Sequence, residues 1–183
     1  MAKGYGTAGT VDLKSIVSSL KEQDKYVAVR MCCFVDNTLA SRYTQLALKT
    51  TAGQAYSDSN GTMADPTNAT VKSYILSLCS ELSKMGVDEI VLLGMRLPEA
   101  SGLEFAFSSS SAVKPTPVTA VSSFGISVTR AMRSSSTKMS VQLTSSTALQ
   151  NGTDEVTGQA PAFCSRYSTA STARPKAPLP PTP

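Results

Sequence analysis

The segment at residues 85–98, MGVDEIVLLGMRLP, constrains the fold of this 183-residue chain more than any other. Gly86 is a residue that typically ends a helix, and residues 87–95 form an apolar run typical of a buried strand. A helix that leads through glycine into a buried strand is typical of parallel α/β proteins. Such proteins place their catalytic and binding residues at the carboxyl ends of the strands, where this segment has Leu93 and Gly94.

Helical and strand-like patterns alternate along the chain. Apolar residues at helical spacing predict helices near residues 13–24, 39–48, 71–82 and 121–132. Apolar or alternating runs predict strands near residues 26–34, 87–95 and 139–143, and a short strand or loop edge at residues 103–107. The run at residues 26–34 suits a strand buried on both faces. This alternation predicts parallel strands, with any site at their carboxyl ends.

The chain is predicted to hold one folded domain. Residues 1–10 are glycine-rich and expected to be flexible, and residues 11–150 are expected to form the α/β domain. Residues 151–183 are rich in Ser, Thr and Pro, which predicts a largely disordered tail. A complete (β/α)8 barrel usually needs about 250 residues, so 183 residues are short for one.

The reactive side chains exclude several kinds of site. The chain has no histidine, which removes the commonest general base and metal ligand. The four cysteines form no CxxC pair, so neither a metal nor another cofactor is expected, and buried apolar packing is their favoured role. They are Cys32, Cys33, Cys79 and Cys164. Cys32 and Cys33 are adjacent, so in a strand they would face opposite sides.

Charge and hydropathy limit the partners of the chain. The formal net charge is +4, and the basic residues form no dense run, so nucleic-acid binding is not expected. No apolar run is long enough for a membrane span, and the first residues, MAKGYGTAG, lack the apolar centre of a signal peptide.

Several motifs agree in order and spacing with one known family. A strand pattern G-F-D-E-I-Q-x-D-Y-x-R-F-P is matched at Gly86, Asp88, Glu89, Ile90, Arg96 and Pro98. Upstream, a pattern A-R-x-x-x-F-x-D is matched at Arg30, Phe34 and Asp36. A loop pattern rich in Gly, Trp and Asp is matched at Leu48, Gly53, Tyr56, Asp58, Gly61, Asp65 and Pro66. Over about residues 12–98 the chain resembles a (β/α)8 glycoside hydrolase family of bacterial cell-surface and secreted proteins.

The resemblance implies a carbohydrate partner and a particular fold. It implies an α/β fold that is a partial or diverged (β/α)8, TIM-barrel-like copy with parallel strands. Such a slice, or fragment, would leave open sheet edges, through which self-association is expected. The resemblance also implies an extracellular or cell-envelope location.

The sequence departs from the family pattern where catalysis would occur. Leu93 stands where the family has an acid that resembles a catalytic carboxylate, and Gln142 takes the place of an acid on the following strand. Glycosidases normally use two carboxylates. If the chain is an enzyme at all, it is expected to be a glycosidase with a degenerate active site and weak or no activity. Asp36 is then the best remaining catalytic carboxylate.

Four further residues are candidates for substrate binding, each with a structural alternative. Arg30 could contact substrate or form an ion pair with Glu89, the favoured interpretation. Glu89 sits low on its strand and is favoured as structural. Tyr56 could stack on a sugar or pack within its loop, and Arg96 could bind a sugar or be solvated.

Two acids also have structural interpretations. Asp36 could equally be the N-cap of the helix that follows it. Asp65, before Pro66, is favoured as a turn or cap residue.

The sequence leaves three functions open. The first is a glycoside hydrolase-like domain that acts on or binds carbohydrate. The second is a non-catalytic carbohydrate-binding or cell-envelope structural module, and the third is an unrelated α/β domain. Strand order separates the first two functions, which need a barrel-type fold, from the third. The strands of a barrel arc are neighbours in chain order, whereas the strand order of a doubly wound sheet has a reversal point.

Overall fold

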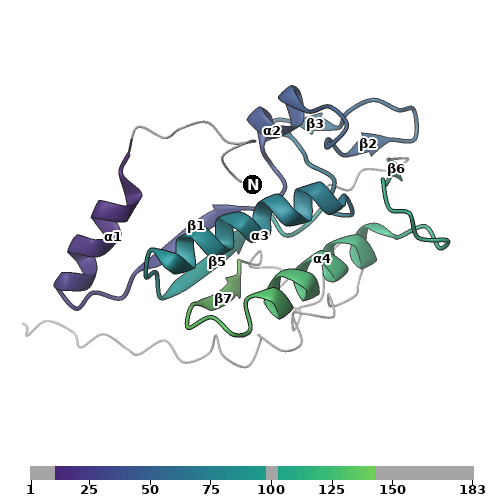
Figure 1. The fold of residues 1–183 in the computed structure, drawn as a ribbon. Coiled ribbons are helices and arrows are strands. Elements are labelled where there is room, and N and C mark those ends of the chain that lie inside the picture. Colours follow the sequence, from purple (N-terminus) through teal and green to yellow (C-terminus); the bar gives the residue numbers. More distant parts are fainter. Residues whose placement is uncertain (1–10, 98–102, 143–183) are drawn as a thin grey trace, which may run out of the picture.

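A computed structural model describes residues 11–97 and 103–142 of the chain. Its centre is a parallel sheet with two helices packed on one face, and a group of short strands lies beyond the carboxyl ends of the sheet (Figure 1). The helices are α1 (Leu13–Glu22), α2 (Asn37–Arg42), α3 (Ala69–Lys84) and α4 (Pro117–Ala131). The strands are β1 (Ala28–Cys32), β2 (Lys49–Thr50), β3 (Ser57–Asp58), β4 (Gly61–Thr62), β5 (Glu89–Leu93), β6 (Phe105–Ala106) and β7 (Lys138–Val141).

The central sheet has the order β1-β5-β7, and both pairings are parallel. Glu89 at the start of β5 pairs with Ala28 on one side and with Lys138 on the other. The order follows the chain without a reversal point, as neighbouring strands of a (β/α)8 barrel do. The predicted α/β fold with parallel strands is confirmed, as a partial, barrel-like arc of three strands.

The predicted helix near residues 71–82 is observed as α3, which is two residues longer at each end. The side chain of Asn68 accepts hydrogen bonds from the backbone N–H groups of Thr70 and Val71, which caps the helix. Gly86 follows the last turn with a φ of +89°, a conformation that glycine adopts without strain. This glycine turns the chain from α3 into β5.

The helix α4 begins earlier than the apolar pattern predicts. Thr116 and Thr119 form a reciprocal capping box, and Pro117 occupies the first turn, where its missing N–H costs nothing. The helix therefore starts four residues before Val121, the first apolar residue of the predicted stripe. A capping signal placed ahead of the apolar stripe explains the difference.

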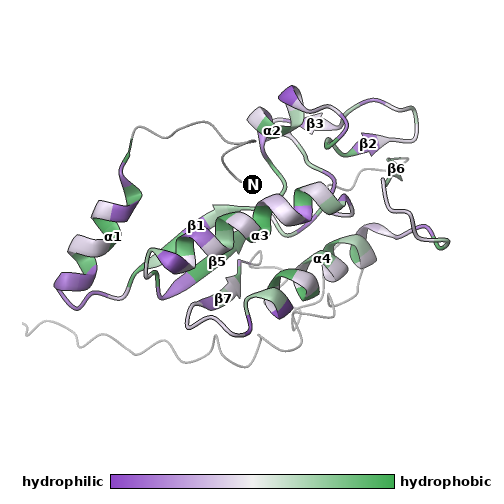
Figure 2. Ribbon diagram, viewed as in Figure 1, coloured by the Kyte–Doolittle hydropathy of each residue, from purple (hydrophilic) through white to green (hydrophobic). Residues whose placement is uncertain are grey.

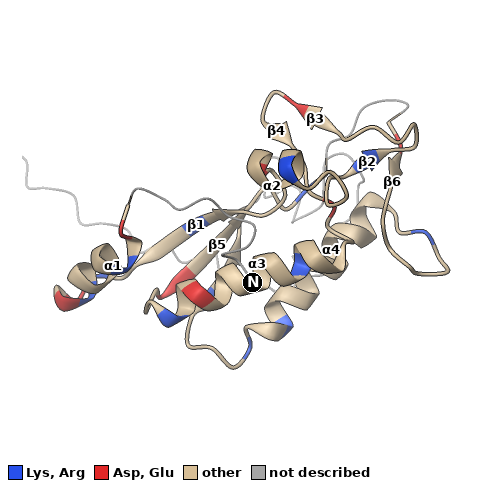
Figure 3. Cartoon of the chain, turned by 45° about the horizontal axis from the view of Figure 1, so that its top comes forward, with Lys and Arg blue, Asp and Glu red and all other residues tan. Residues whose placement is uncertain are grey.

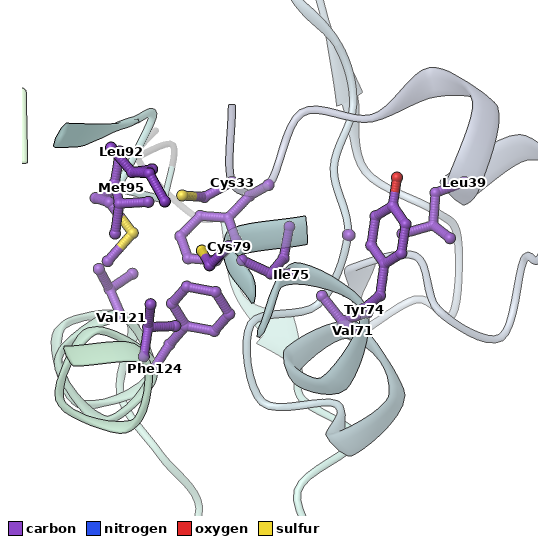
Figure 4. Packing of buried hydrophobic residues seen from close by; sticks show 14 of the residues in the cluster. Cys33, Leu39, Val71, Tyr74, Ile75, Cys79, Leu92, Met95, Val121 and Phe124 are labelled. Carbon is purple, nitrogen blue, oxygen red and sulfur yellow. The ribbon is translucent and has the colours of Figure 1, made fainter. Parts of the chain in front are cut away.

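The core lies between the sheet and the helices α3 and α4. Ile90 and Leu92 of β5 are fully buried and belong to one cluster with Ile75 of α3 and Val128 of α4. Hydrophobic residues on the strands and both helices contribute to it (Figure 2), and the close-up shows their side chains interlocking (Figure 4). The rings of Phe34 and Phe124 meet edge to face with centroids 4.9 Å apart.

The helix predicted at residues 39–48 ends early. The helix α2 stops at Arg42, and Ala47 instead forms an antiparallel bridge with Ala64. Leu48 N–H donates to the Met63 carbonyl, and Asp65 N–H donates to the Leu46 carbonyl. These long-range backbone bonds replace helical ones, so tertiary pairing overrides the local apolar pattern.

The prediction that β1 is buried on both faces is wrong. Ala28, Arg30 and Cys32 are exposed, while Val29 and Met31 on the opposite face are partly buried against the core. No helix of the described residues covers the first face. The reason is that both long helices pack on the same side of the sheet (Figure 1).

The cysteines follow the same division between faces. Cys33 and Cys79 are buried, as predicted, but Cys32 is exposed, so apolar packing is the wrong role for it. Burial raises the pKa of the Cys79 thiol to about 11 and raises that of Cys33 further. The predictions of a flexible start at residues 1–10 and a disordered tail at residues 151–183, and the residue Cys164, lie outside the described residues. Within the described residues, no helix has the length and apolarity needed to cross a membrane.

Candidate functional site

The face of the sheet opposite α3 and α4 carries a polar surface, which we call the open face. Side chains alternate along a strand, and the parallel register places equivalent residues side by side. Every residue of this face is exposed or only partly buried. The open face consists of Ala28, Arg30, Cys32, Glu89, Val91, Leu93, Lys138, Ser140 and Gln142.

A hydrogen bond across the open face joins β1 to the end of β7. The Arg30 Nη2 atom donates to the Gln142 Oε1 atom over 2.6 Å. The two strands are separated by β5, so this bond passes over the middle strand. The expected ion pair between Arg30 and Glu89 is wrong: among the described residues, Arg30 has no carboxylate partner. Glu89 lies opposite Ala28, two residues below Arg30, and is held by other groups.

Glu89 lies at the amino end of the open face. Its Oε2 atom accepts a hydrogen bond of 2.9 Å from the Tyr26 hydroxyl, and its Oε1 atom accepts one from the Ser140 hydroxyl. The Lys138 ammonium lies 5.7 Å from the centre of the Tyr26 ring. Desolvation, together with the bond to Glu89, raises the pKa of Tyr26. This geometry gives Glu89 a structural role, far from the strand ends where chemistry is expected.

Neutral side chains occupy the carboxyl end of the open face. Cys32 and Leu93 are register partners, and Gln142 continues the row on the third strand. Glu89 is the single acid among the open-face residues, whereas Arg30 on β1 and Lys138 on β7 are basic. Figure 3 shows a basic residue on β1 and acidic residues beside the start of β5. The two positions that depart from the family pattern, Leu93 and Gln142, are therefore neighbours beside Arg30.

Asp36 follows β1 but is turned toward the helices. Its Oδ1 atom accepts a hydrogen bond of 2.8 Å from the Leu39 N–H, which caps α2. Its Oδ2 atom accepts one of 3.3 Å from the Tyr74 hydroxyl of α3. Burial and the nearby Asp36 raise the pKa of Tyr74 to about 12, so the hydroxyl remains a donor at neutral pH. The cap interpretation is confirmed, while a catalytic role stays a prediction.

Tyr56 and Arg96 lie in the loops beyond the strands. The Tyr56 ring meets the Phe105 ring edge to face, with centroids 5.6 Å apart, so loop packing is observed for it. Arg96 is exposed, three residues beyond the last residue of β5. The structure does not bring Glu89 to the same end of the sheet as these two residues.

Asp65 is buried and holds two loops together. Its Oδ1 atom accepts from the backbone N–H and the hydroxyl of Thr67, and its Oδ2 atom accepts from the Ser108 N–H. Its exposed fraction is 1%. This confirms the turn role of Asp65.

No group of three acidic, cysteine or histidine side chains suited to a metal occurs in the described residues.

Sequence reasoning missed the direct contact between Arg30 and Gln142 and the exposure of Cys32. The alternation of side chains along each strand was available as a signal and correctly separates Cys32 from Cys33. The register between strands was not available. That register decides which residues of different strands share a row.

Comparisons with known proteins identify the family. A family model described as "Putative glycosyl hydrolase domain" matches residues 2–167. No curated protein matches the chain significantly.

The fold is shared with a solved structure. A hypothetical protein from Ruminiclostridium thermocellum is 20% identical with a TM-score of 0.64, and the match covers 77% of this chain and 71% of that one. The glycoside hydrolase domain of the PelA variant E218A from Pseudomonas aeruginosa is 14% identical with a TM-score of 0.48. That match covers 71% of this chain and 48% of the PelA chain, about half of its length.

Proposed function

Since this chain belongs to the family described as "Putative glycosyl hydrolase domain", we propose that it binds carbohydrate on the open face and hydrolyses it weakly or not at all. In a (β/α)8 barrel the helices cover the outside, so the uncovered face of this sheet corresponds to the interior, and sites form at the carboxyl strand ends. An extracellular or cell-envelope location belongs to the same proposal.

One observation carries the proposed loss of activity. Glycoside hydrolysis normally needs two carboxylates that flank the scissile bond. The carboxyl end of the open face has Cys32, Leu93 and Gln142 instead. A leucine side chain can neither transfer a proton nor stabilise positive charge, and an amide is a poor substitute for an acid.

The remaining acids near the strand ends are engaged in structural contacts. Asp36 caps α2 and bonds to Tyr74, and Asp65 is buried between two loops. Asp36 is the best residual candidate for a catalytic carboxylate because it lies in the short loop that follows the carboxyl end of β1. One carboxylate without a partner supports slow hydrolysis at most.

We expect the full chain to bind at least one glycan of a broad panel with turnover near the uncatalysed background. Binding would be measured on a glycan array and by calorimetry, and turnover by release of reducing ends and of aryl leaving groups. Strong wild-type turnover that persists in an Asp36→Asn variant would contradict the proposal. So would a chain that binds no glycan of the panel.

A pair of matched variants locates the binding surface. Val91 lies in the centre of the open face, and Ile126 is exposed on α4, away from this face. Val91→Glu and Ile126→Glu introduce the same charge and similar bulk. Val91→Glu is expected to weaken glycan binding, and Ile126→Glu is expected to leave it unchanged.

The second candidate function is a purely structural cell-envelope module that retains the fold. It predicts that no glycan binds to the open face.

Self-association through the edge strands β1 and β7 stays a prediction, and the molecular mass of the protein in solution tests it.

A further inference from the structure

We propose that the glycan bound by the open face is acidic, a sugar chain with carboxylate groups, and that Arg30 binds its carboxylates. This inference rests on the proposed carbohydrate binding and specifies its substrate class. The observation behind it is that Arg30 is a cation whose neighbours on the carboxyl half of the open face are neutral.

The guanidinium of Arg30 is exposed and held in place. Its bond to Gln142 over 2.6 Å fixes the side chain across β5 rather than leaving it free in solvent. A guanidinium has five N–H donors in a planar fork that matches the two oxygens of a carboxylate. Because Gln142 is neutral, its bond orients the fork without neutralising the charge.

The acids that could neutralise Arg30 are used elsewhere. Glu89 accepts hydrogen bonds from Tyr26 and Ser140 at the amino end of the sheet. Asp88 forms an ion pair with Lys21 of α1, with 2.8 Å between Nζ and Oδ1. Within the described residues no carboxylate contacts Arg30, so the charge is available to an anionic ligand.

The surroundings of Arg30 suit a sugar as well as a charge. Val91 is its register partner on β5, and Leu93 follows on the same face toward the carboxyl end. These two half-buried apolar side chains lie along the middle strand, which the Arg30–Gln142 bond crosses. A pyranose ring has an apolar face of C–H groups that can rest on such a surface, while a carboxylate on the ring reaches the guanidinium.

The charge of the whole chain favours the same class of ligand. The formal net charge of +4 attracts acidic polymers and raises their encounter rate. This long-range attraction is not selective. A test must therefore separate the local contribution of Arg30 from the effect of net charge.

The test compares oligouronates with their methyl esters on the full chain. Oligomers of galacturonate, glucuronate and mannuronate are titrated by calorimetry, each beside a fully esterified oligomer of equal length. The ester keeps the sugar backbone and removes the charge. The variants are Arg30→Gln, Arg30→Lys and the matched control Arg130→Gln, which removes the same charge from an exposed position of α4.

We expect at least one uronate to bind the wild type at least about tenfold more tightly than its ester, as expected for a charged hydrogen-bonded pair. Arg30→Gln should abolish this preference, and Arg130→Gln should preserve it. Arg30→Lys should retain part of it, because lysine keeps the charge but lacks the planar fork. Thermal unfolding of each variant shows that it is folded.

Two results would overturn the inference. One is equal binding of acid and ester by the wild type, and the other is an equal loss of preference in Arg30→Gln and Arg130→Gln. In both cases glycan binding itself can persist, which leaves the proposed function standing. A chain that binds no neutral glycan, uronate or ester overturns the proposed function as well.

Discussion

Replacing Asp65 with alanine is expected to lower the free energy of unfolding by about 3–5 kcal/mol. The buried carboxylate accepts hydrogen bonds from the Thr67 N–H, the Thr67 hydroxyl and the Ser108 N–H. Alanine would leave these donors without their acceptor in a site that is almost closed to water. Chemical denaturation of the full chain measures the change.

A second aspartate provides the matched control for Asp65→Ala. Asp58 is the last residue of β3, and its partly exposed carboxylate accepts hydrogen bonds from the Asn60 and Gly61 N–H groups of the turn into β4. Asp58→Ala is expected to cost no more than about 1 kcal/mol, since water can replace the carboxylate. Equal losses for the two variants would show that Asp65 does not hold the loops together as described.

Introducing two carboxylates at the carboxyl end of the open face is expected to raise glycan hydrolysis by about 100-fold or more over the wild type. The double variant is Leu93→Asp with Gln142→Asp. Both positions carry an acid in the family pattern that the sequence resembles. Each single variant should gain less, because hydrolysis needs the pair.

The geometry of the sheet specifies what this double variant should do. Positions 93 and 142 occupy neighbouring parallel strands in one row, and such strands lie about 4.8 Å apart. This separation is close to the distance of about 5–5.5 Å found between the carboxylates of retaining glycosidases. Arg30, which contacts position 142, would keep a carboxylate there ionised.

The stereochemistry of the product shows whether hydrolysis is retaining, and a control variant shows whether the gain in rate needs the added carboxylates. Nuclear magnetic resonance of the first product is expected to show retention of the anomeric configuration. The control Leu93→Asn with wild-type Gln142 adds polarity of the same size without an acid and should remain at the wild-type rate. Equal rates for the double variant and the wild type would contradict the role given to these positions.

Local signals in the sequence predict the helices and strands of the central sheet well. The apolar stripe and Gly86 place α3 to within two residues at each end, because both signals act within a few positions of the chain. The helix α2 is different. Its predicted second half is not helical, since residues 46–48 pair with residues 63–65, which no local pattern indicates.

The candidate site depends on information that the sequence does not carry by itself. The predicted ion pair requires Arg30 and Glu89 to share a face, which they do, but the register pairs Glu89 with Ala28, and Arg30 donates to Gln142 instead. Likewise, an apolar run cannot show that both helices cover the same side of β1. Strand register and helix placement are tertiary properties, so the ion pair and the doubly buried strand were wrongly predicted.

The reactivity of Cys32 tests most directly whether carbohydrate occupies the open face. Cys32 is exposed beside Leu93, whereas Cys33 and Cys79 are buried thiols with raised pKa values and should react slowly. A Cys164→Ser background leaves Cys32 as the fast-reacting thiol, and a Cys32→Ser variant gives the baseline. Labelling by a thiol reagent is followed with and without a saturating amount of the glycan that binds best. We predict that the glycan slows the modification of Cys32 severalfold, and a bound glycan that leaves its rate unchanged would contradict the account.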